Sequence, residues 1–100
     1  MDFKVIFNDS FLEDLGRIVK LIATHNPLAA QRLGEKIIRH GQNLRLFPER
    51  HAKVRKRPEL RRFVVRKYFK VFYRIRYDPP IVEVLRCWDA RQGGDPDVSY

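Results

Sequence analysis

The pattern that decides the fold lies in the stretch Arg50–Arg76, RHAKVRKRPELRRFVVRKYFKVFYRIR. It holds twelve Lys or Arg residues and one acid, Glu59, so its formal charge is +11, whereas the rest of the chain sums to −2. From residue 70 onward two sets of side chains alternate, Val71, Tyr73, Ile75 and Tyr77 on one side and Lys70, Phe72, Arg74 and Arg76 on the other. This alternation of β-branched and aromatic residues predicts a half-buried strand. Its cationic side is a rigid basic surface, which attracts a polyanion or an acidic protein.

The composition predicts one folded domain over residues 1–100, in which about 89–100 form a tail. Hydrophobic and charged fractions of 44% and 33% are typical of a soluble globular protein. Because the single cysteine, Cys87, has no partner for an internal disulfide, the chain suits a reducing cytoplasm, where we expect the protein to act. We expect no signal peptide in the N-terminal residues, and no apolar run approaches the roughly 18 residues of a membrane span.

Two helices are expected to follow a first strand, Phe3–Phe7. Ser10 and Glu13 have capping-box spacing, and Asp14 adds a second acid near the positive end of the helix, which we expect from Phe11 to about Thr24. In the next helix Asn26 is the expected cap, Pro27 takes the first position, and the apolar pattern ends near Leu46. Because the connection is short, the two helices should pack as an antiparallel hairpin.

The C-terminal half is expected to form an antiparallel meander. We expect a basic loop at Arg50–Leu60, strands at Phe63–Val65, Phe69–Tyr77 and Ile81–Trp88, and an irregular tail at Asp89–Tyr100. The order β-α-α-β-β-β predicts an α+β fold in which the helical hairpin packs on one face of a small antiparallel sheet.

Neither a metal nor a cofactor is expected. The three histidines, His25, His40 and His51, fall in different elements, and none has a partner at ligand spacing. There is no P-loop and no dinucleotide-binding glycine motif. Cys87 falls in an expected strand, where a small core residue is the usual interpretation.

Metal-free RNA cleavage is the one catalytic option that the residues leave open. It needs a group that takes the 2′-hydroxyl proton, cations that stabilise the phosphorane, and an acid for the leaving oxygen. The candidates for these roles come from adjacent expected strands and the residues next to them, and they are Lys70, Arg74, Arg86, Arg91, Tyr68 and Tyr73. The alternative is structural, since Arg74 and Arg86 can simply cover the outer sheet face and Tyr73 can belong to the core. The candidate contacts to a nucleic acid or another target are Lys53, Lys56, Arg61, Arg66, Lys70, Arg74 and Arg76.

Five segments occur in a recognisable order, namely Ser10–Leu15, Asn26–Ala30, Leu46–Glu49, Tyr73–Ile75 and Val82–Trp88. Together they resemble the RelE/ParE superfamily of bacterial toxin–antitoxin toxins, which are often called plasmid-stabilisation proteins. The resemblance runs from Phe3 to about Gly94. It implies a small cytoplasmic type II toxin that a cognate antitoxin inactivates, and an acidic, amphipathic antitoxin segment would suit the basic surface.

The superfamily divides by target. By resemblance to the mRNA interferase branch, which cuts mRNA on the ribosome, Lys70 and Arg91 fall near its arginines, and Lys53 and Lys56 in the region of its loop lysines. Asp89 stands where many of these relatives have His, and an ordinary Asp is not an acid at neutral pH. The first helix and the turn at residues 26–27 are more similar to the ParE-like branch, the gyrase inhibitors. We therefore favour gyrase over the ribosome, with a nontoxic nucleic-acid-binding module as a third hypothesis.

Overall fold

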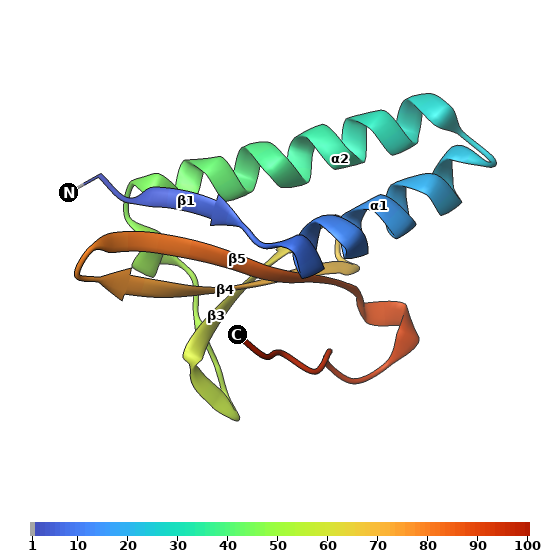
Figure 1. Cartoon of the computed structure of the whole chain (residues 1–100). Coiled ribbons are helices and arrows are strands. Elements are labelled where there is room, and N and C mark those ends of the chain that lie inside the picture. Colours follow the sequence, from blue (N-terminus) through green and yellow to red (C-terminus); the bar gives the residue numbers. More distant parts are fainter. Residues whose placement is uncertain (1) are drawn as a thin grey trace.

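Two helices lie on one face of a five-stranded sheet (Figure 1). The computed structural model describes residues 2–100. The strands are β1 (Lys4–Phe7), β2 (Lys53–Val54), β3 (Arg57–Val65), β4 (Phe69–Tyr77) and β5 (Pro80–Asp89), in the spatial order β1-β5-β4-β3-β2. The helices are α1 (Asp9–Ala23) and α2 (Pro27–Gln42), with short 3₁₀ helices η1 (Asn43–Arg45), η2 (Pro48–Arg50) and η3 (Ala90–Gln92). This confirms the expected α+β class and its helical hairpin.

The sheet is mixed, whereas we expected it to be antiparallel throughout. β1 pairs in parallel with β5, with Val5 opposite Val82. The helical hairpin separates β1 from the meander, so β1 pairs with the last strand of the meander and not with the strand that follows it in the chain. β4 has the predicted bounds.

The expected basic loop at Arg50–Leu60 is wrong, because β2 and the first four residues of β3, residues 57–60, lie there. Pro58 is compatible with β3 because it has no partner in either ladder. The β3–β4 ladder runs only from Arg61 to Val65, and the β2–β3 ladder is irregular at this point. A proline at such a place removes no ladder hydrogen bond.

The predicted capping box of Ser10 and Glu13 does not form at the start of α1. Asn8 is the N-cap of α1 and makes no side-chain cap, and the Ser10 hydroxyl instead donates to the Leu85 carbonyl at 2.9 Å. At the start of α2 the predicted cap is confirmed, since the Asn26 side chain accepts from the Ala29 amide at 3.1 Å. α2 ends at Gln42 rather than near residue 46, and the 3₁₀ helix η1 continues the chain.

Two apolar clusters lie on opposite faces of the sheet. The main core fills the space between the sheet and the helices, with Phe11, Ile37, Tyr73 and Cys87 among its fully or almost fully buried members. The second cluster, on the outer face, consists of Val54, Leu60, Phe72, Leu85 and Val98, with Trp88 packed against it.

Because of the outer cluster, the cationic side of β4 is partly buried, which the sequence did not predict. The alternation of side chains is as predicted, but Phe72 on the cationic side is only 1% exposed. The β4–β5 register shifts between Phe72 and Tyr73, where Leu85 is the extra residue of β5. Val98 completes the cluster from the C-terminal segment, so the outer face is partly apolar and covered. Within residues 2–100, the helices are too short or too polar to cross a membrane.

Candidate functional site

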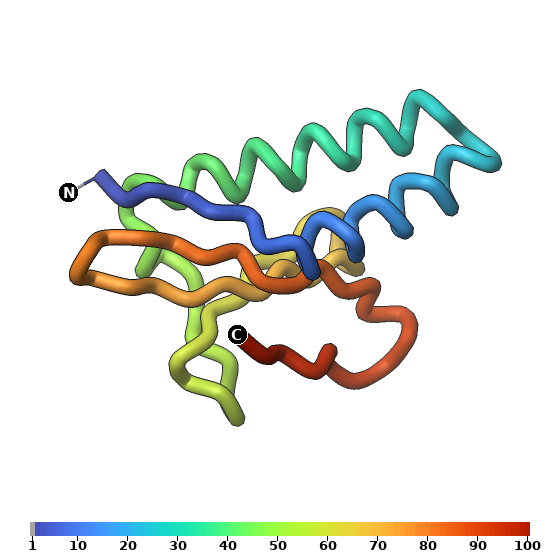
Figure 2. Tube along the Cα trace, viewed as in Figure 1, coloured from blue at the N-terminus to red at the C-terminus, as the bar shows by residue number. Residues whose placement is uncertain are grey.

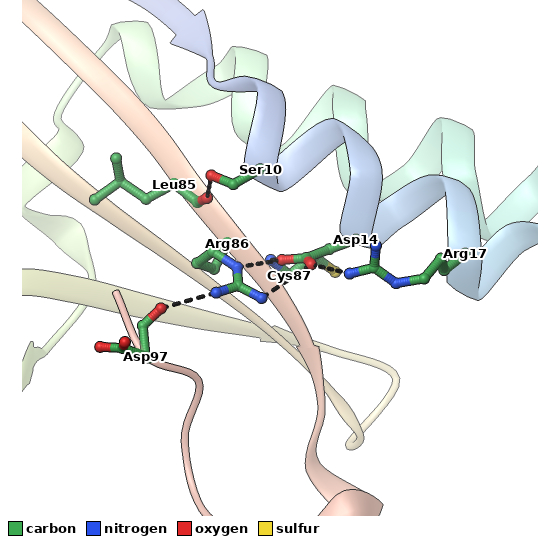
Figure 3. Close-up of polar contacts among 7 residues, drawn as sticks. All are labelled: Ser10, Asp14, Arg17, Leu85, Arg86, Cys87 and Asp97. Atoms are coloured by element: carbon green, nitrogen blue, oxygen red, sulfur yellow. Dashed lines mark hydrogen bonds and ion pairs between the residues drawn. The ribbon is translucent and has the colours of Figure 1, made fainter. Parts of the chain in front are cut away.

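Where the pairing of β1 with β5 ends, α1 covers the edge of β5 (Figure 3). β1 pairs with β5 only as far as Val84, whose carbonyl then accepts from the Asn8 amide at 3.0 Å. The backbone groups that follow along this edge of β5 form hydrogen bonds with side chains of α1. The Ser10 hydroxyl donates to the Leu85 carbonyl, and the Asp14 carboxylate accepts from the Cys87 amide at 3.0 Å. An open strand edge is a template for unwanted pairing, and these contacts protect it.

Asp14 is the centre of this arrangement and is only 4% exposed. Its Oδ2 lies 2.6 Å from Arg86 Nε, and its Oδ1 lies 3.0 Å from Arg86 Nη2 and 2.6 Å from Arg17 Nη2. The hydrogen bonds to Asp14 raise the pKa of Arg86. Arg86 also donates to the Asp97 carbonyl at 2.8 Å. Arg86, a candidate for phosphate stabilisation, therefore joins α1, β5 and the C-terminal segment to one another.

The cations of the outer sheet face are paired with acids of the same chain. Lys70 Nζ lies 3.0 Å from Asp95 Oδ1, and Arg74 Nε lies 2.8 Å from Glu83 Oε1. Arg76 reaches the same Glu83 oxygen at 3.7 Å. Lys70, Arg74 and Arg76 are thus brought together on one face, as the sequence suggested, with carboxylates beside them.

Arg91 and Tyr73 do not join this group. Arg91 lies in η3 and forms a bidentate pair with Asp89, at 3.0 and 2.8 Å, with its guanidinium carbon 4.9 Å from the centre of the Tyr68 ring. These hydrogen bonds lower the pKa of Asp89. Tyr73 faces the helices, where its hydroxyl donates to the Pro48 carbonyl at 2.6 Å, and burial raises its pKa to about 12.

The other candidate contact residues are spread over the surface. Lys53 is exposed on β2 and Lys56 in the turn that follows it. Arg66 is exposed in the β3–β4 turn with a φ of 52°. Arg61 lies opposite Tyr73 and donates to the carbonyls of Glu49 and His51, away from the outer face.

The structure also brings together two histidines that the sequence did not connect. His40 of α2 and His51, which follows η2, place their Nε2 atoms 3.3 Å apart. The ring of Phe63 stacks on His40 with centroids 4.1 Å apart. Burial lowers the pKa of both imidazoles, and the nearby Arg50 lowers both further. Among residues 2–100, no group of three or more His, Cys, Asp or Glu is placed to hold a metal ion.

An apolar groove of about 280 Å³ lies between α1 and the adjoining ends of β4 and β5. Leu21, one of its lining residues, is 69% exposed. The cations Arg17 and Arg91 also line the groove. The remaining lining residues are Asp14, Ile18, Ile22, Phe69, Cys87, Trp88, Asp89 and Gln92. We refer to it as the α1 groove.

A family model described as "ParE toxin of type II toxin-antitoxin system, parDE" matches residues 5–93. The chain belongs to this family. No curated protein matches the sequence.

Three solved structures share the fold of this ParE-family toxin. The chromosomal ParDE toxin–antitoxin system of P. aeruginosa superposes with a TM-score of 0.74 at 14% identity, over 87% of this chain and 95% of that one. The RelBE2 toxin–antitoxin complex of Mycobacterium tuberculosis gives 0.65 at 18% identity, over 89% and 99%. A mutant of the E. coli toxin RelE in the free state gives 0.60 at 15% identity, over 93% and 88%.

Proposed function

We propose that this toxin stops growth by binding DNA gyrase and that it does not cleave RNA. The match to the ParE toxin family model supports the first part of the proposal, and the pairing of the candidate catalytic cations carries the second part. Lys70, Arg74, Arg86 and Arg91 are each bonded to a carboxylate of the same chain. A guanidinium or ammonium group so engaged has less capacity to stabilise a phosphorane than one aimed at an open site.

The acid–base groups support the same conclusion. Metal-free cleavage needs one group that accepts a proton and one that donates it. Tyr73 is buried with a pKa of about 12, and its hydroxyl is bonded to a backbone carbonyl. Asp89 has a lowered pKa because of its hydrogen bonds to Arg91, so it is ionised at neutral pH and has no proton to donate.

The proposal includes a cognate antitoxin and a cytoplasmic location. The ParDE and RelBE2 structures are named as toxin–antitoxin systems. In this chain the α1 groove offers apolar contacts from Ile18 and Ile22, with Arg17 and Arg91 beside them. An amphipathic acidic antitoxin segment is complementary to such a surface, and the formal charge of +9 favours its approach.

The direct test is a supercoiling assay with purified gyrase and increasing amounts of toxin. We expect supercoiling activity to fall as toxin is added and to recover when the antitoxin is supplied. Heat-unfolded toxin is the control for nonspecific binding of a basic protein to DNA. Unchanged supercoiling at a large excess of folded toxin would refute the gyrase proposal.

The alternative is a ribosome-dependent endoribonuclease, and one observation favours it. Lys70, Arg74 and Arg76 share one face, where an RNA phosphate can compete with Asp95 and Glu83 for the same cations. Primer extension on mRNA from a translation extract distinguishes the two functions. Cuts that appear only during translation, and that the double substitution Lys70→Ala and Arg91→Ala removes, would establish the nuclease.

A further inference from the structure

Two histidines face each other near the end of α2. In Figure 2 the chain leaves this helix, turns and continues to the edge strand β2, and His51 lies on this connecting segment. The Nε2 atoms of His40 and His51 are 3.3 Å apart, while the ring centres are 5.3 Å apart. The nitrogens are closer than the ring centres, so each ring presents its Nε2 edge to the other.

These two distances are those of a chelating pair. Two imidazoles on one tetrahedral ion, with metal–nitrogen bonds of about 2.05 Å, have their nitrogens about 3.3 Å apart and their ring centres about 5.2 Å apart. The observed separation of 3.3 Å is longer than the roughly 2.7–3.2 Å that is usual for N–H···O hydrogen bonds. The spacing therefore matches a shared ion better than a direct hydrogen bond between the rings.

Aromatic packing holds both rings in place. Phe63 stacks on His40 with centroids 4.1 Å apart and the planes only 9° from parallel. The same Phe63 ring lies 5.5 Å from the His51 ring, and Tyr73 meets His51 edge-on at 6.3 Å. Side chains that are already fixed lose little conformational freedom when they bind a ligand.

The backbone on each side of the pair is fixed as well. His40 belongs to α2 itself. The segment that carries His51 is tied to the sheet, because Arg61 donates to the His51 carbonyl at 2.7 Å and Tyr73 donates to the Pro48 carbonyl at 2.6 Å. The two nitrogens are thus positioned by separate elements of the fold, and their spacing does not depend on a bound ligand.

We propose that His40 and His51 form a binding site for a divalent transition-metal ion such as Zn²⁺, with water completing the coordination. Imidazole nitrogens suit Zn²⁺, Cu²⁺ and Ni²⁺, whereas Mg²⁺ and Ca²⁺ prefer oxygen ligands. A ring that carries its proton on Nε2 moves it to Nδ1, so that both Nε2 lone pairs face the ion. Residues 2–100 supply no group of three or more metal-binding side chains, so water takes the remaining positions.

The site should bind its ion less tightly than a structural zinc site with four protein ligands. It offers two neutral ligands, and the positive charges of Arg50 and Lys36 oppose a further cation beside His40. We expect a dissociation constant for Zn²⁺ on the order of 10 µM. A bound ion would join the end of α2 to the segment before β2.

The test is an NMR titration of the wild-type chain with ZnCl₂, in which the imidazole nitrogens are followed at about pH 7.5, where neutral histidine predominates. We expect the signals of His40 and His51 to shift together and to saturate at one ion per chain. The exposed His25, in the connection between the helices, is an internal control whose signals should stay in place. Mg²⁺ at the same concentrations should shift none of the three.

Matched substitutions measure the contribution of the pair. Calorimetry should show that His51→Gln weakens Zn²⁺ binding at least about tenfold, because the loss of a ligand should cost no less than the loss of a supporting contact. His25→Gln removes an exposed histidine and should leave the affinity unchanged.

Three results would overturn the proposal. One is a shift of only one signal of the pair, which would leave His40 and His51 a hydrogen-bonded pair only. The second is saturation of His25 at the same Zn²⁺ concentration, or equal affinity of H51Q and H25Q, which indicates nonspecific binding. The third is a doubling of the mass in sedimentation when Zn²⁺ is added, which indicates an ion shared between two chains. If H51Q does not fold, the wild-type ring signals decide alone. The titration contains neither gyrase nor RNA, so its result is independent of the supercoiling assay.

Discussion

Replacing Asp14 by Asn should destabilise the toxin far more than its one-atom change suggests. The carboxylate is 4% exposed and accepts hydrogen bonds from Arg86 at 2.6 and 3.0 Å, from Arg17 at 2.6 Å and from the Cys87 amide at 3.0 Å. Asn keeps the shape but removes the charge, and its amide group points N–H donors at Arg86. The guanidinium then stays beside α1 without its counter-charge.

The magnitude follows from the burial of the pair. Removing one partner of a buried ion pair costs about 3–5 kcal/mol. The Arg86 side chain is 21% exposed, and water therefore offsets part of the loss. We expect a decrease in unfolding free energy of about 3 kcal/mol, at the lower end of that range. For a chain of this length, each kcal/mol lowers the melting temperature by about 4–8 °C, so the expected shift is about 15 °C.

Urea unfolding followed by circular dichroism measures this difference. The matched control is Glu13→Gln, which removes the same charge from the exposed preceding position and should change stability by at most about 0.5 kcal/mol. The double substitution Asp14→Leu and Arg86→Met removes both charges and should cost less than Asp14→Asn alone. A loss below about 1 kcal/mol for Asp14→Asn, or one equal to that of the control, would refute the assigned role of the pair.

Three further substitution sets test other parts of the fold. Gly41→Ala should destabilise by about 1–3 kcal/mol because the new Cβ would lie 2.8 Å from a ring atom of β1, whereas Gly16→Ala, with open space around it, should stabilise α1 by up to about 1 kcal/mol; urea unfolding reports both signs. Tyr73→Phe leaves a carbonyl of η2 without its donor and should cost about 1–3 kcal/mol, and the same change at the exposed Tyr77 should cost little in thermal unfolding. The histidine pair has pKa values lowered from the ordinary 6.5, so the unfolded chain binds more protons, and the unfolding free energy should fall as the pH drops below about 6.5. His51→Gln should make this decrease shallower in pH-dependent urea unfolding, and an unchanged slope would contradict the assigned burial.

The sequence by itself determined the features that depend on neighbouring residues. The alternation from residue 69 to 77 gave β4 with its observed bounds, because a strand with one buried face needs apolar residues at every second position. The Asn26–Pro27 pair marked the start of α2, since a cap bonds to an amide three residues away. The order of these elements was enough for the α+β class and for the resemblance to the toxin superfamily.

Only the tertiary structure decided which distant groups meet. The sequence predicted that Asp14 lies near the positive end of the first helix. The helix instead begins at Asp9, and Asp14 binds Arg86 because α1 closes the edge of β5. The parallel pairing of β1 and the approach of His40 to His51 likewise depend on the path of the chain, which local periodicity does not encode. The C-terminal segment, residues 95–100, is the clearest case, because its sequence has no periodicity. Its position on the outer face follows from the reversal at Gly93–Gly94 and from cations that β3, β4 and β5 bring to one surface.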